Sequence, residues 1–196
     1  MPWQGFRSGL RLGARFTMTR PLRWVTLYCH APTLPQQAGA VKSLPGNDMS
    51  EHRTSLHWAR NGGPFARGNY VSAHTIRYSG GQTLNAAPSP EFGGDTAHAD
   101  PEQMLLSALS SCHMLTFLAV AANRGYIVDS YEDDAVATLG KNADGKMAVI
   151  QATLSPRVTF SGDKQPSAEE YSKLHERAHA GCFIANSVRT TVDVRL

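Results

Sequence analysis

The main part of this 196-residue chain lacks an excess of positive charge, although the whole chain has a formal net charge of +3. Residues 49–196 contain 13 Lys and Arg against 15 Asp and Glu, a net charge of −2. A nucleic-acid-binding domain usually presents a basic patch or stripe. We therefore expect no nucleic-acid partner for this part of the chain. It also lacks internal repeats and low-complexity tracts, and its composition is ordinary for a globular protein, so we expect one domain over residues 49–196.

The first 47 residues lack acidic side chains altogether. Their positive charges are Arg7, Arg11, Arg15, Arg20, Arg23 and Lys42. No sustained helical or alternating period runs through them, so we expect residues 1–48 to be a disordered basic leader. The longest apolar run, residues 24–29, is too short to cross a bilayer and does not form a signal-peptide core. The composition fits an organellar transit peptide. However, "MSEHRTSLHW" leads straight into the first expected strand, and we favour a translation start at Met49.

Residues 49–125 predict a β-hairpin followed by a long helix. The stretches "TSLHWAR" (54–60) and "NYVSAHTIRY" (69–78) are typical of strands, and a glycine-rich turn joins them. Residues 79–99 are expected to be a loop. A helix should begin after Asp100, because Pro101 follows this N-cap residue, and it should end at Gly125. The side chains between are almost all apolar or small, so this helix should be buried over most of its surface.

The rest of the chain predicts further strands around a second helix. Residues 130–160 should form two or three strands, with Asp144-Gly145 as a hairpin turn. Ser167 and Glu170 have the spacing of a capping box, and Gly181 marks the end of that helix. A further helical turn is expected in "CFIANSV", and "RTTVDVRL" (189–196) alternates as a strand. The order indicates an α+β fold, in which an antiparallel sheet packs on one long buried helix.

Only three cysteines are present, so each position matters. Cys29 lies in the leader, and Cys112 lies in the middle of the apolar helix. Cys182 directly follows Gly181, near the start of a helical turn whose free N–H groups would favour a thiolate. Taken alone, a free cysteine on an apolar helix is most often a small core residue. Composition therefore assigns no chemistry to them.

Two motifs resemble segments of the OsmC/Ohr family of thiol peroxidases. The stretch "ADPEQMLLSALSSCHM" (99–114) is similar to the family's Asp/Asn-Pro-Glu-Glu/Gln-Leu-Leu motif, which continues through small residues to Ala-Cys. "RAHAGCFIANSV" (177–188) resembles the second cysteine segment, usually Gly/Lys-Cys-Pro-hydrophobic-Ser/Asn. The resemblance covers roughly residues 50–196, with both motifs in the family's order. It implies an OsmC-like fold and a thiol-dependent peroxidase that reduces organic hydroperoxides, closer to the OsmC-like branches than to Ohr.

The resemblance also implies roles for particular residues. Cys112 matches the peroxidatic cysteine, Cys182 the resolving cysteine, and Glu102 the catalytic glutamate at the helix start. The family pairs that glutamate with an arginine of the first hairpin; Arg67 in "FARGNYVS" matches best, and Arg60 is the alternative. A nearby cation would offset the rise in thiol pKa that burial causes. A second thiol would intercept the sulfenic acid before it is oxidised further.

The implied partners are an organic hydroperoxide, a dithiol reductant such as a lipoylated protein, and a second copy of the chain. The resemblance implies no metal or other cofactor, no membrane partner and a cytoplasmic location. Helix geometry also favours a dimer, because ten residues place Glu102 and Cys112 about 15 Å apart along one straight helix. Either the helix is broken or Glu102 acts at Cys112 of another chain. Since the family forms intertwined homodimers with sites at the interface, we expect the second arrangement.

Some features favour other interpretations. Phe183 stands where the family commonly has proline, and His113, which points about 100° away from Cys112 on a helix, is not expected to be a catalytic base. A rival interpretation is a metal- or ligand-binding protein, in which the four residues Cys112, His175, His179 and Cys182 could form a zinc site. We consider a solvated helix face a better explanation of the two helical histidines. A redox sensor or carrier with the same fold but without turnover is a third interpretation.

Overall fold

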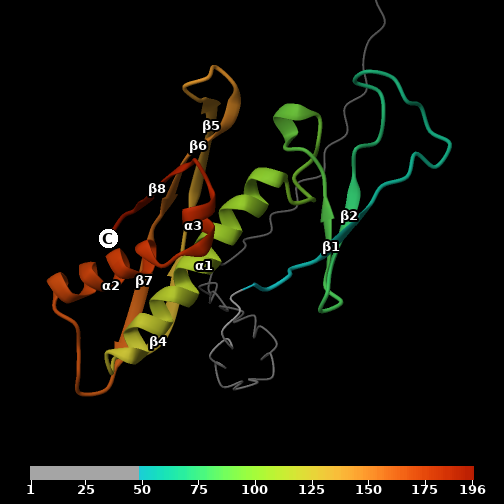
Figure 1. Cartoon of the computed structure of the whole chain (residues 1–196). Helices are drawn as coiled ribbons and strands as arrows, with labels where there is room; N and C mark the ends of the chain where they lie inside the picture. The colour runs from blue at the N-terminus through green and yellow to red at the C-terminus, as the bar shows by residue number, and fades with distance from the viewer. Residues whose placement is uncertain (1–48) are drawn as a thin grey trace, which may run out of the picture. The chain divides into compact units, whose positions relative to one another are not determined.

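The structure is a computed structural model that describes residues 49–196, and our expectations for residues 1–48 lie outside this range. Residues Ser50–Leu196 form one compact unit. Its elements are β1 (Thr54–His57), β2 (His74–Tyr78), β3 (Thr83–Ala86), the 3₁₀ turn η1 (Pro90–Phe92), α1 (Pro101–Asn123), β4 (Ile127–Asp133), β5 (Val136–Lys141), β6 (Met147–Leu154), β7 (Pro156–Ser161), α2 (Ala168–Ala180), α3 (Phe183–Ser187) and β8 (Thr191–Val194). The α+β class predicted from the sequence is confirmed (Figure 1).

The strands form three small sheets with the orders β1-β2-β3, β4-β7 and β5-β6-β8. All neighbouring pairs are antiparallel, as expected, except β6 and β8, which are parallel. A parallel neighbour requires a crossover connection. Here the chain between β6 and β8 forms this crossover, and it contains β7, α2 and α3.

Two expectations about the strands are wrong in detail. Residues 79–99 are not only loop, because Thr83–Ala86 form β3 and pair with β2. The segment after α1 contains four strands, β4 to β7, rather than two or three. The pairing of β3 with β2 across the sheet gives Thr83–Ala86 their extended conformation, and this pairing is not encoded in the local sequence.

Both long helices begin with the predicted capping residues. In α1 the Asp100 carboxylate accepts a hydrogen bond from the Gln103 N–H at 2.7 Å, and the Gln103 side chain accepts one from the Asp100 N–H at 3.3 Å. In α2 the side chains of Ser167 and Glu170 exchange the same pair of bonds. Each box satisfies two N–H groups that the helix itself leaves without partners. Gly125 follows α1 with a φ of 75°, which a residue with a side chain rarely adopts.

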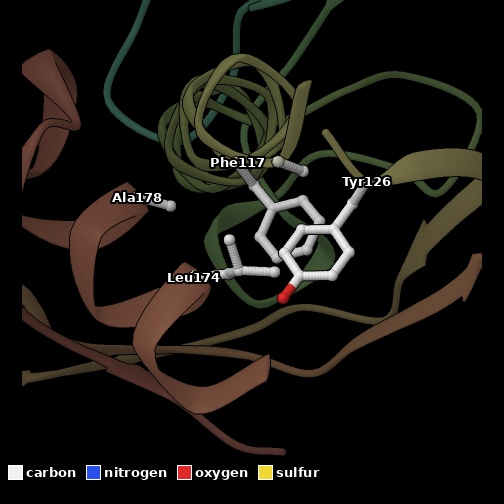
Figure 2. Packing of buried hydrophobic residues seen from close by; sticks show 5 residues of the cluster. Phe117, Tyr126, Leu174 and Ala178 are labelled. Carbon is white, nitrogen blue, oxygen red and sulfur yellow. The ribbon is translucent and has the colours of Figure 1, made fainter. Parts of the chain in front are cut away.

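The core lies between α1, α2 and the β4-β7 sheet. Phe117 of α1 is fully buried and packs with Ala121, Tyr126, Leu174 and Ala178. Figure 2 shows its ring pointing from α1 toward Tyr126 and the side chains of α2. This cluster attaches α2 to α1 along the half of α1 that follows Cys112.

α1 is less buried within one chain than its composition predicts. Only Leu109, His113, Phe117 and Ala121 are fully buried, and these four residues form one stripe at intervals of four. By length and composition α1 could also cross a membrane, although the core helix of a soluble protein passes the same test. The expectation of a helix buried over most of its surface is therefore wrong for a single chain.

Candidate functional site

The structure brings Cys112 and Cys182 together from two segments that lie 70 positions apart in the sequence. Cys112 lies in the middle of α1, and Cys182 is the N-cap of α3, directly after α2. Both thiols are free, and the Cys112 side chain lies near enough to Cys182 to raise the pKa of the Cys182 thiol. Two neighbouring thiols can be joined by a disulfide when their Cα atoms lie within about 7 Å.

Gly181 allows this close approach. A Cβ atom at position 181 would lie 3.1 Å from Cγ2 of Thr116, one helical turn after Cys112 in α1. The hydroxyl of Thr116 donates a hydrogen bond to the carbonyl oxygen of Cys112 at 2.9 Å, so this turn is also fixed locally. The glycine that ends α2 thus lets the next residue, Cys182, reach α1.

The surroundings of Cys182 do not favour its thiolate, contrary to our expectation. Its sulfur accepts a hydrogen bond from the Ala185 N–H at 3.4 Å, as a cysteine at a helix start should. The side chain is nevertheless 1% exposed, and burial raises the pKa of the Cys182 thiol more than the Ala185 N–H lowers it. The adjacent Cys112 thiol raises the pKa further. Because loss of solvation opposes the charged form, the Cys182 thiol is held in its protonated form more strongly than an exposed thiol would be.

Glu102 lies away from the two cysteines of its own chain. α1 is unbroken from Pro101 to Asn123, so the ten residues between Glu102 and Cys112 separate them by about 15 Å along the axis. Glu102 instead lines a cleft of about 570 Å³ at the start of α1, together with Asp100, Phe92 and residues of β5. The alternative of a broken helix is therefore wrong.

Neither candidate arginine contacts Glu102 within the chain. Arg67 is exposed, in the turn formed by the pairing of Ala66 with Asn69. Arg60 donates a hydrogen bond to the carbonyl oxygen of Gly63 at 2.9 Å, which closes its own turn. Among residues 49–196, none of the ion pairs involves Arg60, Arg67 or Glu102. A site that combines all four predicted residues is thus not assembled within one copy.

Sequence reasoning missed a buried pair of histidines beside the cysteines. Nε2 of His113 and Nδ1 of His175 share a hydrogen bond of 3.0 Å, and each side chain is 1% exposed. The expectation that His175 lies on a solvated face is wrong, because that face of α2 packs on α1. His113 could have been recognised as buried, since it lies four residues from both Leu109 and Phe117 on one face of the helix.

The rival zinc set is not assembled in the part of the chain that the structure describes. No group of three or more His, Cys, Asp or Glu side chains in residues 49–196 has the geometry to hold a metal ion. His175 forms its hydrogen bond with His113 and not with either cysteine. The contacts therefore support a pair of thiols and a separate pair of imidazoles.

Comparison with known proteins decides the family. Residues 93–196, just over half of the chain, match the family described as OsmC-like protein. The chain belongs to the OsmC-like family. Its matched region contains Glu102, Cys112 and Cys182 but neither Arg60 nor Arg67.

Solved OsmC-like structures resemble this chain over nearly their whole length. An OsmC-like protein of unknown function from Vibrio cholerae is 43% identical, with a TM-score of 0.73, over 75% of this chain and 99% of that chain. Organic hydroperoxide resistance proteins share the fold at lower identity. The one from Elizabethkingia anophelis is 16% identical, with a TM-score of 0.58 and coverage of 76% and 96%. OhrB of Bacillus subtilis is 20% identical, with a TM-score of 0.53 and coverage of 75% and 96%. No curated protein sequence matches the chain.

Proposed function

We propose that this protein is a thiol-dependent peroxidase that reduces organic hydroperoxides, with Cys112 as the peroxidatic and Cys182 as the resolving cysteine. The observation that supports this proposal most is the proximity of two free thiols from distant segments of an OsmC-like chain. The names of the two organic hydroperoxide resistance proteins with the same fold support the substrate class.

The proposed reaction has two steps. The Cys112 thiolate attacks the O–O bond of the hydroperoxide, the sulfur is oxidised to sulfenic acid, and the other oxygen leaves as an alcohol after taking a proton. The Cys182 sulfur then attacks the sulfenic sulfur, a disulfide forms and water leaves. A dithiol, with a lipoylated protein as our candidate, returns both cysteines to thiols and is itself oxidised to a disulfide. Burial of Cys182 beside Cys112 supports the second step, because the resolving thiol needs no diffusion to reach its target.

We propose that the remaining site residues come from a second copy of the chain in an intertwined homodimer. Glu102 cannot reach Cys112 of its own unbroken helix, and Arg67 is exposed without an ion pair among residues 49–196. Much of the apolar α1 is also uncovered in one chain. A partner that covers α1 would bury this surface and bring Glu102 and an arginine, Arg67 or Arg60, to the opposite Cys112. Membership in the OsmC-like family favours a soluble protein, and we place it in the cytoplasm.

Cysteine variants test the roles of the two thiols. Cys112→Ser should abolish consumption of an alkyl hydroperoxide. Cys182→Ser should allow one turnover and then accumulate sulfenic or sulfinic acid on Cys112, because no second thiol intercepts it. Cys29→Ser is the matched control and should keep full activity. Mass spectrometry of oxidised wild-type protein should show a Cys112–Cys182 disulfide; its absence would disprove the resolving role. Formation of that disulfide without repeated turnover, whichever dithiol is supplied, would instead favour a redox sensor.

Subunit mixing tests the shared site. Neither Cys112→Ser nor Glu102→Ala should be active alone. When the two variants exchange subunits, the serine chain should still supply its glutamate to the intact cysteine of the alanine chain. One working site should then form in each heterodimer. If native mass spectrometry shows heterodimers but no activity returns, Glu102 does not act across the interface.

A further inference from the structure

We propose that His113 and His175 form a proton-responsive latch between α1 and α2, which positions Cys182 beside Cys112 when both imidazoles are neutral. The proposal builds on the roles proposed above for the two cysteines. The latch is the hydrogen bond between Nε2 of His113 and Nδ1 of His175, whose rings lie nearly parallel with an interplanar angle of 6°.

The pair packs against aromatic rings of α1 and α2. The Phe117 ring stacks on His175 with centroids 4.3 Å apart, and the Tyr171 ring meets His175 edge-on at 4.7 Å. The outer nitrogens, Nδ1 of His113 and Nε2 of His175, have no hydrogen-bond partner within residues 49–196. A neutral pair suits this arrangement, because one ring donates its N–H and the other accepts it. A proton added to either ring would be a buried charge with no carboxylate bonded to that ring among the described residues.

The ionisable groups around the pair come from α1, α2, β4 and β8. They are Cys112, Tyr171, His179, Tyr131 and Asp133, together with Glu176 and Asp193, which share a cleft of about 320 Å³ with His175 and His179. Asp133 favours a charged His113, but its carboxylate already accepts hydrogen bonds from the Ser110 hydroxyl and from the Ser155 N–H at 2.7 Å. Burial outweighs these groups and lowers the pKa of each histidine to about 4; His179 lowers the pKa of His113 further, and His113 that of His175.

Protonation should therefore favour separation of α2 from α1. A histidine released to solvent has its ordinary pKa near 6.5, so the open form binds a proton more readily than the closed form between pH 6.5 and 4. We call the equilibrium constant for separation of α2 from α1 the opening constant. With a pKa near 6.5 in the open form and about 4 in the closed form, one histidine of the pair should raise this constant about 30-fold between pH 7.5 and pH 5.

The latch is linked to the thiols at both ends. His113 directly follows Cys112 in α1, and α2, which carries His175, ends at the residue before Gly181 and Cys182. Gly181 also packs against Thr116 of α1. Movement of α2 away from α1 would therefore carry the fully buried Cys182 out of reach of Cys112 and into solvent. The consequence is that acid slows the resolving step beyond the ordinary loss of thiolate.

Native-state hydrogen exchange of the α2 amides, corrected for intrinsic exchange rates, measures the opening constant directly. The control is the double variant His113→Gln, His175→Asn, which keeps a donor and an acceptor near the positions of Nε2 and Nδ1 but cannot take up a proton in this range. We expect the opening constant to rise about 30-fold from pH 7.5 to pH 5 in the wild type and to stay nearly constant in the double variant. Equal changes in both proteins would overturn the proposal. If the double variant does not fold, the amides of β5 and β6 in the wild type serve as the reference. An equal rise of the opening constant in α2 and in these strands between pH 7.5 and pH 5 would then refute the latch.

A second measurement follows Cys182 itself. In a Cys112→Ser background, a thiol reagent labels Cys182, and the labelling rate is divided by the rate in the double variant of the same background. We expect this ratio to rise about 30-fold from pH 7.5 to pH 5. The intrinsic pH dependence of the thiol cancels in this ratio. An unchanged ratio would show that the pair does not position Cys182. Neither measurement uses a hydroperoxide, so failure of the peroxidase proposal and failure of the latch are separate results.

Discussion

One face of α1 leads to a prediction about how two copies associate. Opposite the buried stripe, the exposed residues of α1 recur at intervals of three or four. They are Gln103, Ser107, Ser111, Leu115, Ala119 and Ala122. Leu115 is the large apolar side chain among them and is 60% exposed in a single chain. If a second copy packs its own α1 here, Leu115→Ser should weaken the dimer while leaving the fold of each chain intact.

The expected size follows from this exposure. Fully burying a leucine side chain stabilises by about 1.5–3 kcal/mol, so covering the exposed 60% of Leu115 contributes about 1–2 kcal/mol. A two-fold interface buries the residue twice, which gives about 2–4 kcal/mol for each dimer. The dissociation constant of the Leu115→Ser dimer should therefore rise roughly 30- to 700-fold.

Sedimentation equilibrium over a dilution series measures this constant. The matched control is Met147→Ser, which changes a side chain that is 59% exposed on β6 and should leave the constant near the wild-type value. Peroxidase activity measured at the same dilutions should fall as the dimer dissociates. A monomeric wild-type protein, or a Leu115→Ser protein that dimerises as strongly as the wild type, would refute the α1 interface.

Three further predictions concern stability. Phe117→Ala should lower the free energy of unfolding by about 3–5 kcal/mol in urea titrations, because it leaves a cavity at the centre of the core. The control Phe92→Ala changes a side chain that is 60% exposed and should alter the free energy of unfolding by less than about 0.5 kcal/mol. The pKa of His113 and of His175 is lowered to about 4 in the folded chain, so the free energy of unfolding should be nearly constant above pH 6.5. Toward pH 4 it should fall by about 3 kcal/mol for the first histidine to be protonated, relative to the non-titrating double variant. Parallel urea titrations that give both proteins the same pH dependence would contradict this. Deleting residues 1–48 should leave the melting temperature and activity nearly unchanged, because Ser50–Leu196 form a compact unit by themselves, and a large drop in melting temperature would contradict this.

The sequence by itself determined the features that depend on neighbouring residues. The N-cap Asp100, the capping box at Ser167 and the helix-ending Gly125 are local hydrogen-bonding and φ preferences, so they were predictable within one or two residues. The hairpin between β5 and β6 follows from Asp144-Gly145 for the same reason. Together with the two cysteine motifs, these local signals were enough for the α+β class and for the resemblance to the OsmC/Ohr family.

Only the tertiary structure decided which distant residues meet. Strand β3 and the parallel pairing of β8 with β6 depend on partners far away in the chain, and no local pattern encodes a register between them. The helical period of α2 shows that His175 and His179 lie on one side, but not whether that side faces water or α1. Packing settled this, because burying His175 requires a polar partner at the same depth, and His113 is the residue that α1 offers there. The proximity of Cys112 to Cys182 has the same origin, because α2 packs on α1 and ends in a glycine small enough to lie against Thr116.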